Sequence, residues 1–269
     1  MRYLLSDLDK IKPLLSDKLI FLFLDYDGTV APIRPKPGLA VISKRAKNIL
    51  RKLSKYPYCK LVVISGRSLK NVRRLVGLDN IIYGGNHGLE LKGPQVRFKS
   101  PVSKKHRAII TKISRVLHNK LRHIKGVLIE NKDLSLSIHY RLVASKNIPL
   151  VKTLFCQATA FNLWRNEIRV RLGKKVLEVC PAVNWDKGKA VLWLLQNMSF
   201  SENASVMPIY IGDDATDEDA FKMLKDSGLT IFVGRPQKTN ARYYVNDTTE
   251  VMTFLSWLEE EMPLSKTVS

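Results

Sequence analysis

The amino-acid sequence predicts an α/β protein in which a small α+β unit interrupts a parallel sheet. Three apolar runs without polar alternation, residues 19–25, 60–65 and 207–214, end in small or polar residues. Each has a helical pattern nearby, which is typical of strands buried on both faces of a parallel sheet. From about residue 93 to residue 181 the pattern changes to alternating strands and amphipathic helices. This change predicts an inserted α+β unit.

The composition allows this architecture. The 269 residues are 45% hydrophobic and 26% charged, enough for one large or two modest domains with sizeable cores. No apolar run has membrane-spanning length, and charges interrupt any signal-peptide core in "MRYLLSDLDKIKPLL". The three scattered cysteines, Cys59, Cys156 and Cys180, predict neither a disulfide framework nor a metal site. We therefore expect a soluble, intracellular, cytoplasmic protein without a membrane partner.

The formal net charge of +21 has two interpretations, attraction of a small anionic substrate or binding to nucleic acid or another acidic surface. The basic residues are spread over "KKHRAIITKISRVLHNKLRHIK", "RKLSKYPYCK" and many single sites, which favours solvated helix faces over one dedicated patch. Aromatic residues are not regularly interleaved with them. We therefore expect no nucleic-acid partner.

The elements of the parallel part follow from the apolar runs. After the insertion, residues 187–198, 217–224 and 249–262 read as helices that alternate with the later strands. Ligands of such sheets lie beyond the carboxyl ends of the strands. The polar residues that end the apolar runs are therefore the candidate site residues.

The inserted part begins with an amphipathic helix that has a basic outer face, predicted by apolar residues at spacings of three and four: Ile109, Ile113, Val116, Leu117, Leu121 and Ile124. Residues 134–141 alternate strictly between apolar and polar, and residues 168–179 form a hairpin pattern around Gly173-Lys174. We expect the polar face of the resulting sheet to cover something. The expected division is a core of residues 1–93 and 182–269 with an insertion at 94–181.

The first acidic motif is "FLFLDYDGTV", in which Asp25 and Asp27 end an apolar run. On a regular strand the two carboxylates would share one face and repel each other. A hard divalent cation relieves that repulsion, and Mg²⁺ binds one or two carboxylates while it keeps waters and substrate phosphate oxygens. Because Gly28 allows the chain to turn, the two carboxylates need not lie on one strand face.

The second acidic motif is "GDDATDED", residues 212–219, which also follows an apolar run. If the sheet brings both strand ends together, three or more carboxylates converge on one ion. In the alternative interpretation Asp213 and Asp214 form a turn, and Asp217, Glu218 and Asp219 occupy a helix N-terminus, where the dipole favours acids. That alternative accounts for Glu218 and Asp219, but less well for two acidic clusters at the ends of apolar runs.

Such a site suits phosphoryl transfer, because a metal offsets the repulsion between a carboxylate nucleophile and a phosphate. In this hypothesis Asp25 attacks phosphorus and Asp27 protonates the leaving oxygen. Thr29 and Ser65 are candidates to bind phosphate oxygens. Lys187 could neutralise the phosphate, although an exposed lysine is the simpler interpretation of that residue taken alone.

These motifs carry a resemblance. "DYDGT", "ISGR", the lysine of "WDKGKA" and "GDDATDED" have the order of the four motifs of the haloacid dehalogenase superfamily. Within it, the sequence resembles the trehalose-6-phosphate phosphatases from about Leu19 to Phe221, in "LDYDGTVAPI", "GNHGLE", "ENKDLSLSIHYR", "LEVCPAVNWDKG" and "YIGDDATDEDAF". The resemblance implies a Rossmann-like core with helices on both faces of its sheet and an inserted cap domain. It also implies Mg²⁺-dependent hydrolysis of trehalose 6-phosphate through an aspartyl-phosphate intermediate, in trehalose biosynthesis.

The resemblance also implies a role for each motif residue. Asp25 is the nucleophile and a metal ligand. Asp27 is the general acid and then the base, with its backbone carbonyl on the metal. Asp213 is the third protein ligand, supported by Asp214 and Asp217. The phosphoryl group is held by Lys187 and Ser65, with Thr29 and Gly66 beside it.

Sugar recognition is implied for the cap, through Glu130, Lys132 and Glu178, with Arg67, Asn86 and His87 on the core side. Strict alternation would place Glu130 and Lys132 in phase with the buried Leu134 and Leu136. We therefore predict a bulge or loop near Asp133.

Other functions stay open at this point. The chain could act on another sugar phosphate, such as sucrose phosphate or mannosylglycerate phosphate, or be a non-catalytic basic binding module. The presence of Asp25, Asp27 and Asp213 favours an enzyme. A trehalose-phosphate synthase is the macromolecular partner that the resemblance suggests.

Overall fold

The protein is described by a computed structural model that covers residues 1–102, 104–198 and 205–262. It contains two compact units, a core unit of Met1–Phe98 and Asp186–Ser269 and an inserted unit of Lys99–Trp185. Both borders lie a few residues later than the sequence suggested. At the first border the reason is visible, because the chain passes Gly93 and Pro94 within a hairpin at the edge of the core sheet.

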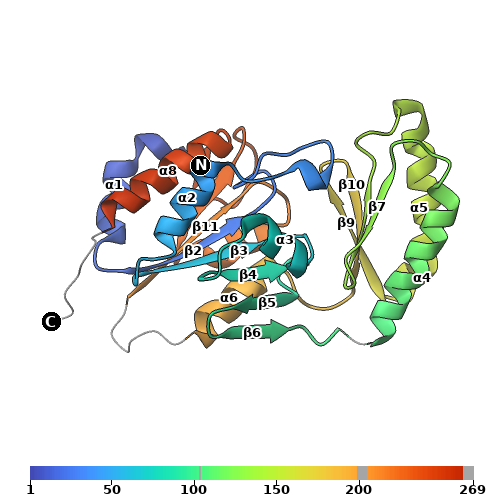
Figure 1. The fold of residues 1–269 in the computed structure, drawn as a ribbon, viewed down its shortest axis with the longest axis horizontal. Coiled ribbons are helices and arrows are strands. Elements are labelled where there is room, and N and C mark those ends of the chain that lie inside the picture. The colour runs from blue at the N-terminus through green and yellow to red at the C-terminus, as the bar shows by residue number, and fades with distance from the viewer. Residues whose placement is uncertain (103, 199–204, 263–269) are drawn as a thin grey trace. The chain divides into compact units, whose positions relative to one another are not determined.

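The core unit is built on a nine-stranded sheet with strand order β1-β13-β12-β11-β2-β3-β4-β5-β6 (Figure 1). The strands are β1 (Arg2–Tyr3), β2 (Leu19–Asp25), β3 (Cys59–Ile64), β4 (Ile82–Gly85), β5 (Glu90–Gly93), β6 (Val96–Lys99), β11 (Val206–Gly212), β12 (Leu229–Val233) and β13 (Tyr243–Val245). The α-helices are α1 (Leu8–Leu15), α2 (Lys44–Leu53), α3 (Leu69–Val76), α6 (Lys187–Asn197), α7 (Glu218–Leu224) and α8 (Thr248–Glu261). Short 3₁₀ helices are η1 (Leu4–Ser6) and η2 (Pro37–Leu39).

The centre of this sheet is parallel, as the apolar runs predicted. β2 lies between β11 and β3, and both pairings are parallel. The register places Asp25 opposite Ile64 and Leu24 opposite Ile211, so these three strands end together. The pairing of β4 with β5 is antiparallel. The acidic motifs after β2 and β11 are therefore neighbours in space.

Helices cover both faces of the core sheet. Residues of α1, α2, α3 and α8 share one apolar cluster with alternate residues of β2 and β11, such as Leu22 and Ile209. On the other face Tyr210 of β11 meets Phe221 of α7 edge to face, with ring centroids 5.7 Å apart. Asp25 follows Phe21 and Phe23 in the strand alternation, so its side chain belongs to this second face. That is the face on which α6 and α7 pack.

The inserted unit is a four-stranded antiparallel sheet with strand order β7-β8-β10-β9 and two long helices on one face. Its strands are β7 (Leu128–Asn131), β8 (Leu136–His139), β9 (Ile168–Gly173) and β10 (Val176–Pro181). Its helices are α4 (Lys104–Leu121), η3 (Ser145–Asn147) and α5 (Ile148–Trp164). The predicted α+β character of the insertion is therefore confirmed.

The predicted break of the register near Asp133 is also confirmed. β7 ends at Asn131 and β8 begins at Leu136, and Asp133 has a left-handed φ of 70° in the turn between them. Glu130 therefore pairs with Ser137 and is out of phase with Leu136. The alternating strand is shorter than expected, and the second hairpin turns at Lys174-Lys175, one residue later than predicted.

In the part of the chain that the structure describes, every helix is too short or too polar to cross a membrane.

Candidate active site

The centre of the site is a buried ion pair at the carboxyl end of β2. Lys187 Nζ lies 2.6 Å from Asp25 Oδ1, although the two residues are 162 positions apart in the sequence. Lys187 is the first residue of α6, which starts there because the Asp186 side chain caps the helix and accepts a hydrogen bond from the Lys189 amide at 2.8 Å. Lys187 is 1% exposed, so its interpretation as an ordinary surface lysine is wrong.

Asp217 organises this centre through both of its carboxylate oxygens. Oδ1 accepts hydrogen bonds from Lys187 Nζ and from the Tyr210 hydroxyl, both at 2.7 Å. Oδ2 accepts from the backbone amides of Asp213 at 3.0 Å and Asp214 at 2.9 Å. One buried carboxylate thus fixes both the lysine and the turn that carries Asp213.

The electrostatics of the centre favour a cation. Burial raises the pKa of the Asp25 carboxyl, and the charges of Asp217 and Asp213 act in the same direction against the opposing effect of Lys187. Burial by itself lowers the pKa of Lys187, but Asp217 and Asp25 outweigh it and raise that pKa well above its usual value. Lys187 therefore stays protonated. One ammonium group faces three carboxylates, and this leaves an excess of negative charge.

Asp25, Asp213 and Asp217 form a group that could hold a metal ion, because one oxygen from each lies within 4.8 Å of the others. Hard carboxylate oxygens are the donors that Mg²⁺ prefers. Asp217 already accepts four hydrogen bonds. Asp25 and Asp213 are therefore better placed than Asp217 to bind the ion directly.

The turn after β2 lies directly against Asp213. Gly28 has φ +89°, and a Cβ atom at that position would lie 2.1 Å from Asp213 Oδ2, so another residue there would be strained and would displace the carboxylate. The next residue, Thr29, is fully buried. Its hydroxyl has no hydrogen-bond partner among the residues that the structure describes. A buried polar atom of this kind fits a site that binds an oxygen ligand.

Asp27 points to a different partner. Its two carboxylate oxygens accept hydrogen bonds from Arg67, from Nε at 2.7 Å and from Nη2 at 2.6 Å. Arg67 is itself held by the Pro37 carbonyl and the Asn71 side chain, at 2.8 and 3.0 Å, and its guanidinium lies over the Tyr26 ring. Asp25 and Asp27 are thus separated, as the glycine after them allowed.

Two turns beside Arg67 contain the remaining predicted core residues. The amides of Asn86 and His87 donate to the carbonyls of Arg67 and Ser65, at 2.7 and 2.9 Å. Asn86 and His87 both have left-handed φ angles, 50° and 58°, which turn the chain sharply after β4. The His87 ring lies against Gly66, where a Cβ atom would be 2.7 Å from Cε1. The two loops therefore form one structure at the ends of β3 and β4.

Two acidic residues of the second motif lie outside the carboxylate group, and two residues that support the centre were not predicted from the sequence. Asp214 accepts a hydrogen bond from the Ala215 amide at 2.6 Å and is not part of the carboxylate group that could hold a metal. Glu218 binds the Asn240 backbone at 2.9 Å and so has a structural role. Tyr210 and the capping Asp186 were missed. A tyrosine two residues before "GDD" was the signal available for the former.

The predicted sugar-binding residues also gather, within the inserted unit. Glu130 and Glu178 both pair with Ser137 across the sheet, so their side chains belong to its polar face. Lys132 Nζ lies 2.9 Å from Glu178 Oε1, and the Ser135 and Ser137 hydroxyls donate to the same oxygen at 3.3 Å. His139 Nε2 lies 3.2 Å from Glu130 Oε2, which supports a structural role for that histidine.

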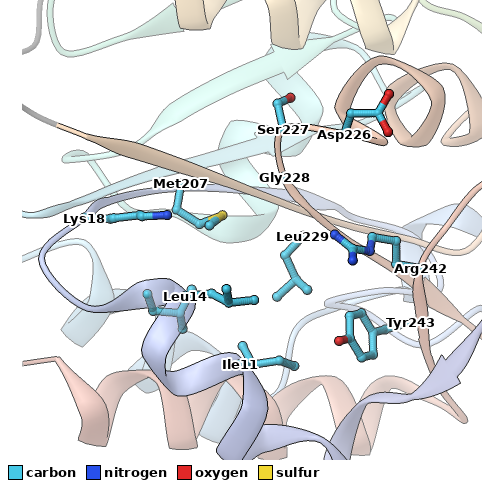
Figure 2. Close-up of a pocket in the computed structure, with 11 residues that line it drawn as sticks. Ile11, Leu14, Lys18, Met207, Asp226, Ser227, Gly228, Leu229, Arg242 and Tyr243 are labelled. Carbon is cyan, nitrogen blue, oxygen red and sulfur yellow. The ribbon is translucent and has the colours of Figure 1, made fainter.

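A cavity of about 220 Å³ in the core unit is a separate feature (Figure 2). It lies between α1 and the beginnings of β11, β12 and β13, where Met207, Leu229 and Tyr243 line it. The carboxylates follow the opposite ends of these strands. This cavity is therefore not part of the candidate active site.

The fold, with acidic residues at the carboxyl ends of its parallel strands, resembles that of haloacid dehalogenase-like hydrolases of known structure. A hydrolase of this class from Bacteroides thetaiotaomicron has the same fold, with a TM-score of 0.61 at 17% identity over 90% of this chain and 100% of that one. The C-terminal domain of trehalose-6-phosphate phosphatase from C. albicans also has this fold, with a TM-score of 0.82 at 24% identity over 96% of this chain and 98% of that one.

More particularly, the chain belongs to the trehalose-phosphatase family, whose model matches residues 23–249. A probable trehalose-phosphate phosphatase D from Arabidopsis thaliana is 38% identical over 92% of this chain and 69% of the relative. The resemblance stated from the motifs is therefore confirmed.

Proposed function

We propose that this protein is a phosphatase that hydrolyses trehalose 6-phosphate to trehalose and phosphate, as part of trehalose biosynthesis. The observation that carries the proposal is the buried group of Asp25, Lys187, Asp213 and Asp217 at the carboxyl end of β2, in a chain of the trehalose-phosphatase family.

In the first step a carboxylate oxygen of Asp25 attacks phosphorus. The new bond joins that oxygen to phosphorus, the bond from phosphorus to the sugar oxygen breaks, and Asp27 gives its proton to the leaving oxygen. Lys187 binds Asp25 Oδ1, so Oδ2 is the oxygen proposed to attack. The buried Thr29 hydroxyl and Ser65 are proposed to bind phosphate oxygens, beside Gly66.

In the second step water attacks the phosphorus of the aspartyl phosphate, and Asp27 accepts the proton of that water. The bond from phosphorus to the Asp25 oxygen breaks, which releases phosphate and restores the Asp25 carboxylate. Arg67 donates to both oxygens of Asp27, an arrangement that holds the carboxylate form needed for this step. Proton donation in the first step requires one of those hydrogen bonds to open. Arg67 is thus proposed to position the acid and base of the reaction.

The acidic group fits Mg²⁺, with Asp25, Asp213 and the Asp27 backbone carbonyl as the proposed protein ligands and Asp214 and Asp217 as supporting carboxylates. When bound, the ion offsets the repulsion between the nucleophilic carboxylate and the phosphate. Burial and the neighbouring carboxylates raise the pKa of Asp25 and so oppose its ionisation. A bound cation would favour the ionised carboxylate that the reaction needs.

The sugar is proposed to be recognised by Glu130, Lys132 and Glu178 of the inserted unit, with Arg67, Asn86 and His87 of the core unit. Carboxylates and an ammonium group suit hydroxyls, which both donate and accept hydrogen bonds. The Lys132–Glu178 ion pair at 2.9 Å supports this proposal, because it holds both groups in a defined position on the polar face of the inserted sheet. A trehalose-phosphate synthase partner and a cytoplasmic location remain predictions from the sequence.

The deciding experiment measures phosphate release from trehalose 6-phosphate, sucrose 6-phosphate, mannosylglycerate phosphate and glucose 6-phosphate, each with Mg²⁺ and with a chelator. We expect Mg²⁺-dependent release with a clear preference for trehalose 6-phosphate. Comparable rates on sucrose 6-phosphate would overturn the substrate, and full activity in metal-free protein would overturn the metal. Absence of release from every substrate would favour the non-catalytic binding module.

A further inference from the structure

The helical face of the inserted unit, formed by α4 and α5, has exposed aromatic and basic side chains that have no role in the proposed reaction. The two helices lie side by side on one face of the four-stranded sheet (Figure 1). Lys120 of α4 donates to Gln157 of α5 at 3.4 Å, and Lys105 near the start of α4 lies 2.8 Å from Glu167, just after α5. The two helices thus form one continuous antiparallel surface.

α5 exposes several apolar side chains on its outward side and buries others on its inward side. Lys152 is its single charged residue in seventeen. Trp164 is 81% exposed and Phe161 is 64% exposed, and their ring centroids lie 6.5 Å apart. These two side chains project from the helix as an aromatic pair. An apolar side of this kind on a surface helix indicates a contact with something outside the chain.

The surroundings of the aromatic pair are basic. The inserted unit has eighteen lysines and arginines and four carboxylates, so it carries +14 of the total charge of +21. Glu130 and Glu178 belong to the opposite face of the sheet, and Asp133 lies 2.8 Å from Arg107. The fourth, Glu167, is bound by Lys105 and Arg165. α4 itself contains six lysines and arginines and α5 one, and neither helix contains a carboxylate, so the helical face presents an excess of positive charge.

Basic residues lie directly beside the aromatic pair. The Arg165 guanidinium lies 5.6 Å from the centre of the Phe161 ring, and Arg165 shares Glu167 with Lys105. Further along α4, Lys112 and Arg115 are exposed. Aromatic residues that project from the midst of lysines and arginines are the combination found where a helix lies on a membrane interface.

We propose that the helical face of the inserted unit binds the surface of a bilayer that contains anionic lipids. Phe161 and Trp164 enter the interface between headgroups and acyl chains, and the basic residues around them attract the anionic headgroups. The expectation of no membrane partner rested on the absence of a spanning segment. A surface contact needs none.

The test uses the full chain and two vesicle preparations, phosphatidylcholine alone and phosphatidylcholine with phosphatidylserine at two to one. Co-sedimentation at low salt should show binding to the anionic vesicles and little to the neutral ones. High salt should release the protein, because it screens the attraction. Absence of binding to the anionic vesicles at low salt would overturn the proposal.

Two sets of variants separate the aromatic pair from the charge. Phe161→Ser with Trp164→Ser should weaken binding to anionic vesicles by about tenfold or more, from lost apolar burial. The control is Leu14→Ser with Met223→Ser, two exposed apolar residues of the core unit, which should bind like the unchanged chain. Equal binding by the aromatic variant would show charge attraction without an interfacial contact and would overturn the proposal.

The charge is tested with two triple variants. One combines Lys104→Gln, Lys112→Gln and Arg115→Gln in the inserted unit, and the other combines Lys44→Gln, Arg45→Gln and Lys55→Gln in the core unit. All six residues are exposed, three in each unit. The first set should lose most of the vesicle binding and the second little, although the net charge changes equally. Equal losses would assign the attraction to the whole molecule and overturn the proposed face. Phosphate release is expected to continue in every variant, so failure here is distinct from failure of the proposed enzyme function.

Discussion

The core unit and the inserted unit differ in the balance and the burial of their charged residues. The core unit has twenty-seven lysines and arginines and twenty carboxylates, and its buried Asp25 and Asp217 both pair with the buried Lys187. The inserted unit has eighteen basic residues and four carboxylates, and its two long helices contain seven of the basic residues and no carboxylate. Net charge therefore does not mark the proposed active site. The charges of the candidate site lie close to charges of the opposite sign, while most of the excess charge of the inserted unit is exposed to water.

The largest effect on activity is expected from a change at Asp25 of the core unit. Asp25→Asn should reduce phosphate release from trehalose 6-phosphate by about 10⁴-fold or more, because an amide cannot replace the attacking carboxylate. Steady-state phosphate assays measure this, and circular dichroism checks that the protein is folded. Asp226→Asn, an exposed carboxylate of the same unit, is the matched control and should keep full activity. Unchanged turnover in Asp25→Asn would reject the proposed nucleophile.

A second change tests whether buried charge in the core unit also stabilises it. Asp217→Asn should lower the free energy of unfolding by about 3 kcal/mol, because Lys187 loses one buried charge partner and the amide cannot accept all four hydrogen bonds. Urea unfolding followed by fluorescence measures the loss. Asp214→Asn in the neighbouring turn is the control, with an expected loss well below that of Asp217→Asn. A similar loss in both would contradict the organising role of Asp217.

The inserted unit should affect specificity more than chemistry. Glu178→Gln weakens the position of Lys132 on the polar sheet face, so kcat/KM for trehalose 6-phosphate should fall about ten- to a hundredfold. The rate with p-nitrophenyl phosphate, which has no sugar, should change little. Asp133→Asn, in the β7–β8 turn of the same unit, is the control. An equal loss on both substrates would place Glu178 in the chemistry or the fold instead.

The smallest effect is expected at an ion pair of the inserted unit between the exposed Lys105 and the partly buried Glu167. Hydrogen bonds from Lys105 and Asn162 lower the pKa of Glu167 from 4.5 to about 2. A lowered pKa means that Glu167 stabilises the fold above pH 4.5 and loses this contribution as the pH falls towards 2. Unfolding of the protein and of Glu167→Gln should therefore differ slightly at neutral pH and converge in acid. A difference that grows in acid would contradict this sign.

Much of the architecture could be predicted from the sequence. The unbroken apolar run "LIFLFLD" gave β2 with both of its ends correct, and the change to alternating patterns located the insertion. The division at Gly93 was less accurate, because the short hairpin of β5 and β6 at the sheet edge has too few residues to show a pattern. Short edge elements depend on pairing with a neighbour, which the local sequence does not describe.

Prediction of the candidate site was limited in the same way, because its contacts join distant parts of the chain. Asp25, Asp213 and Lys187 could be named because acidic motifs at the ends of apolar runs, and their resemblance to a known family, are visible in the chain. The clamp of Arg67 on Asp27 and the contact of Tyr210 with Asp217 could not be derived. Arg67 and Asp27 are 40 residues apart, and their meeting depends on the register of β2 with β3.

The sequence by itself determined the strands of the central sheet, the insertion and the candidates for the reactive groups, because hydrophobic period and motif spacing are properties of neighbouring residues. Only the tertiary structure decided that Lys187 is buried and that Asp25 and Asp27 face different partners. The physical reason is that a charged group's partner and its exposure to water are set by whichever side chains the fold packs around it, and these come from distant parts of the chain.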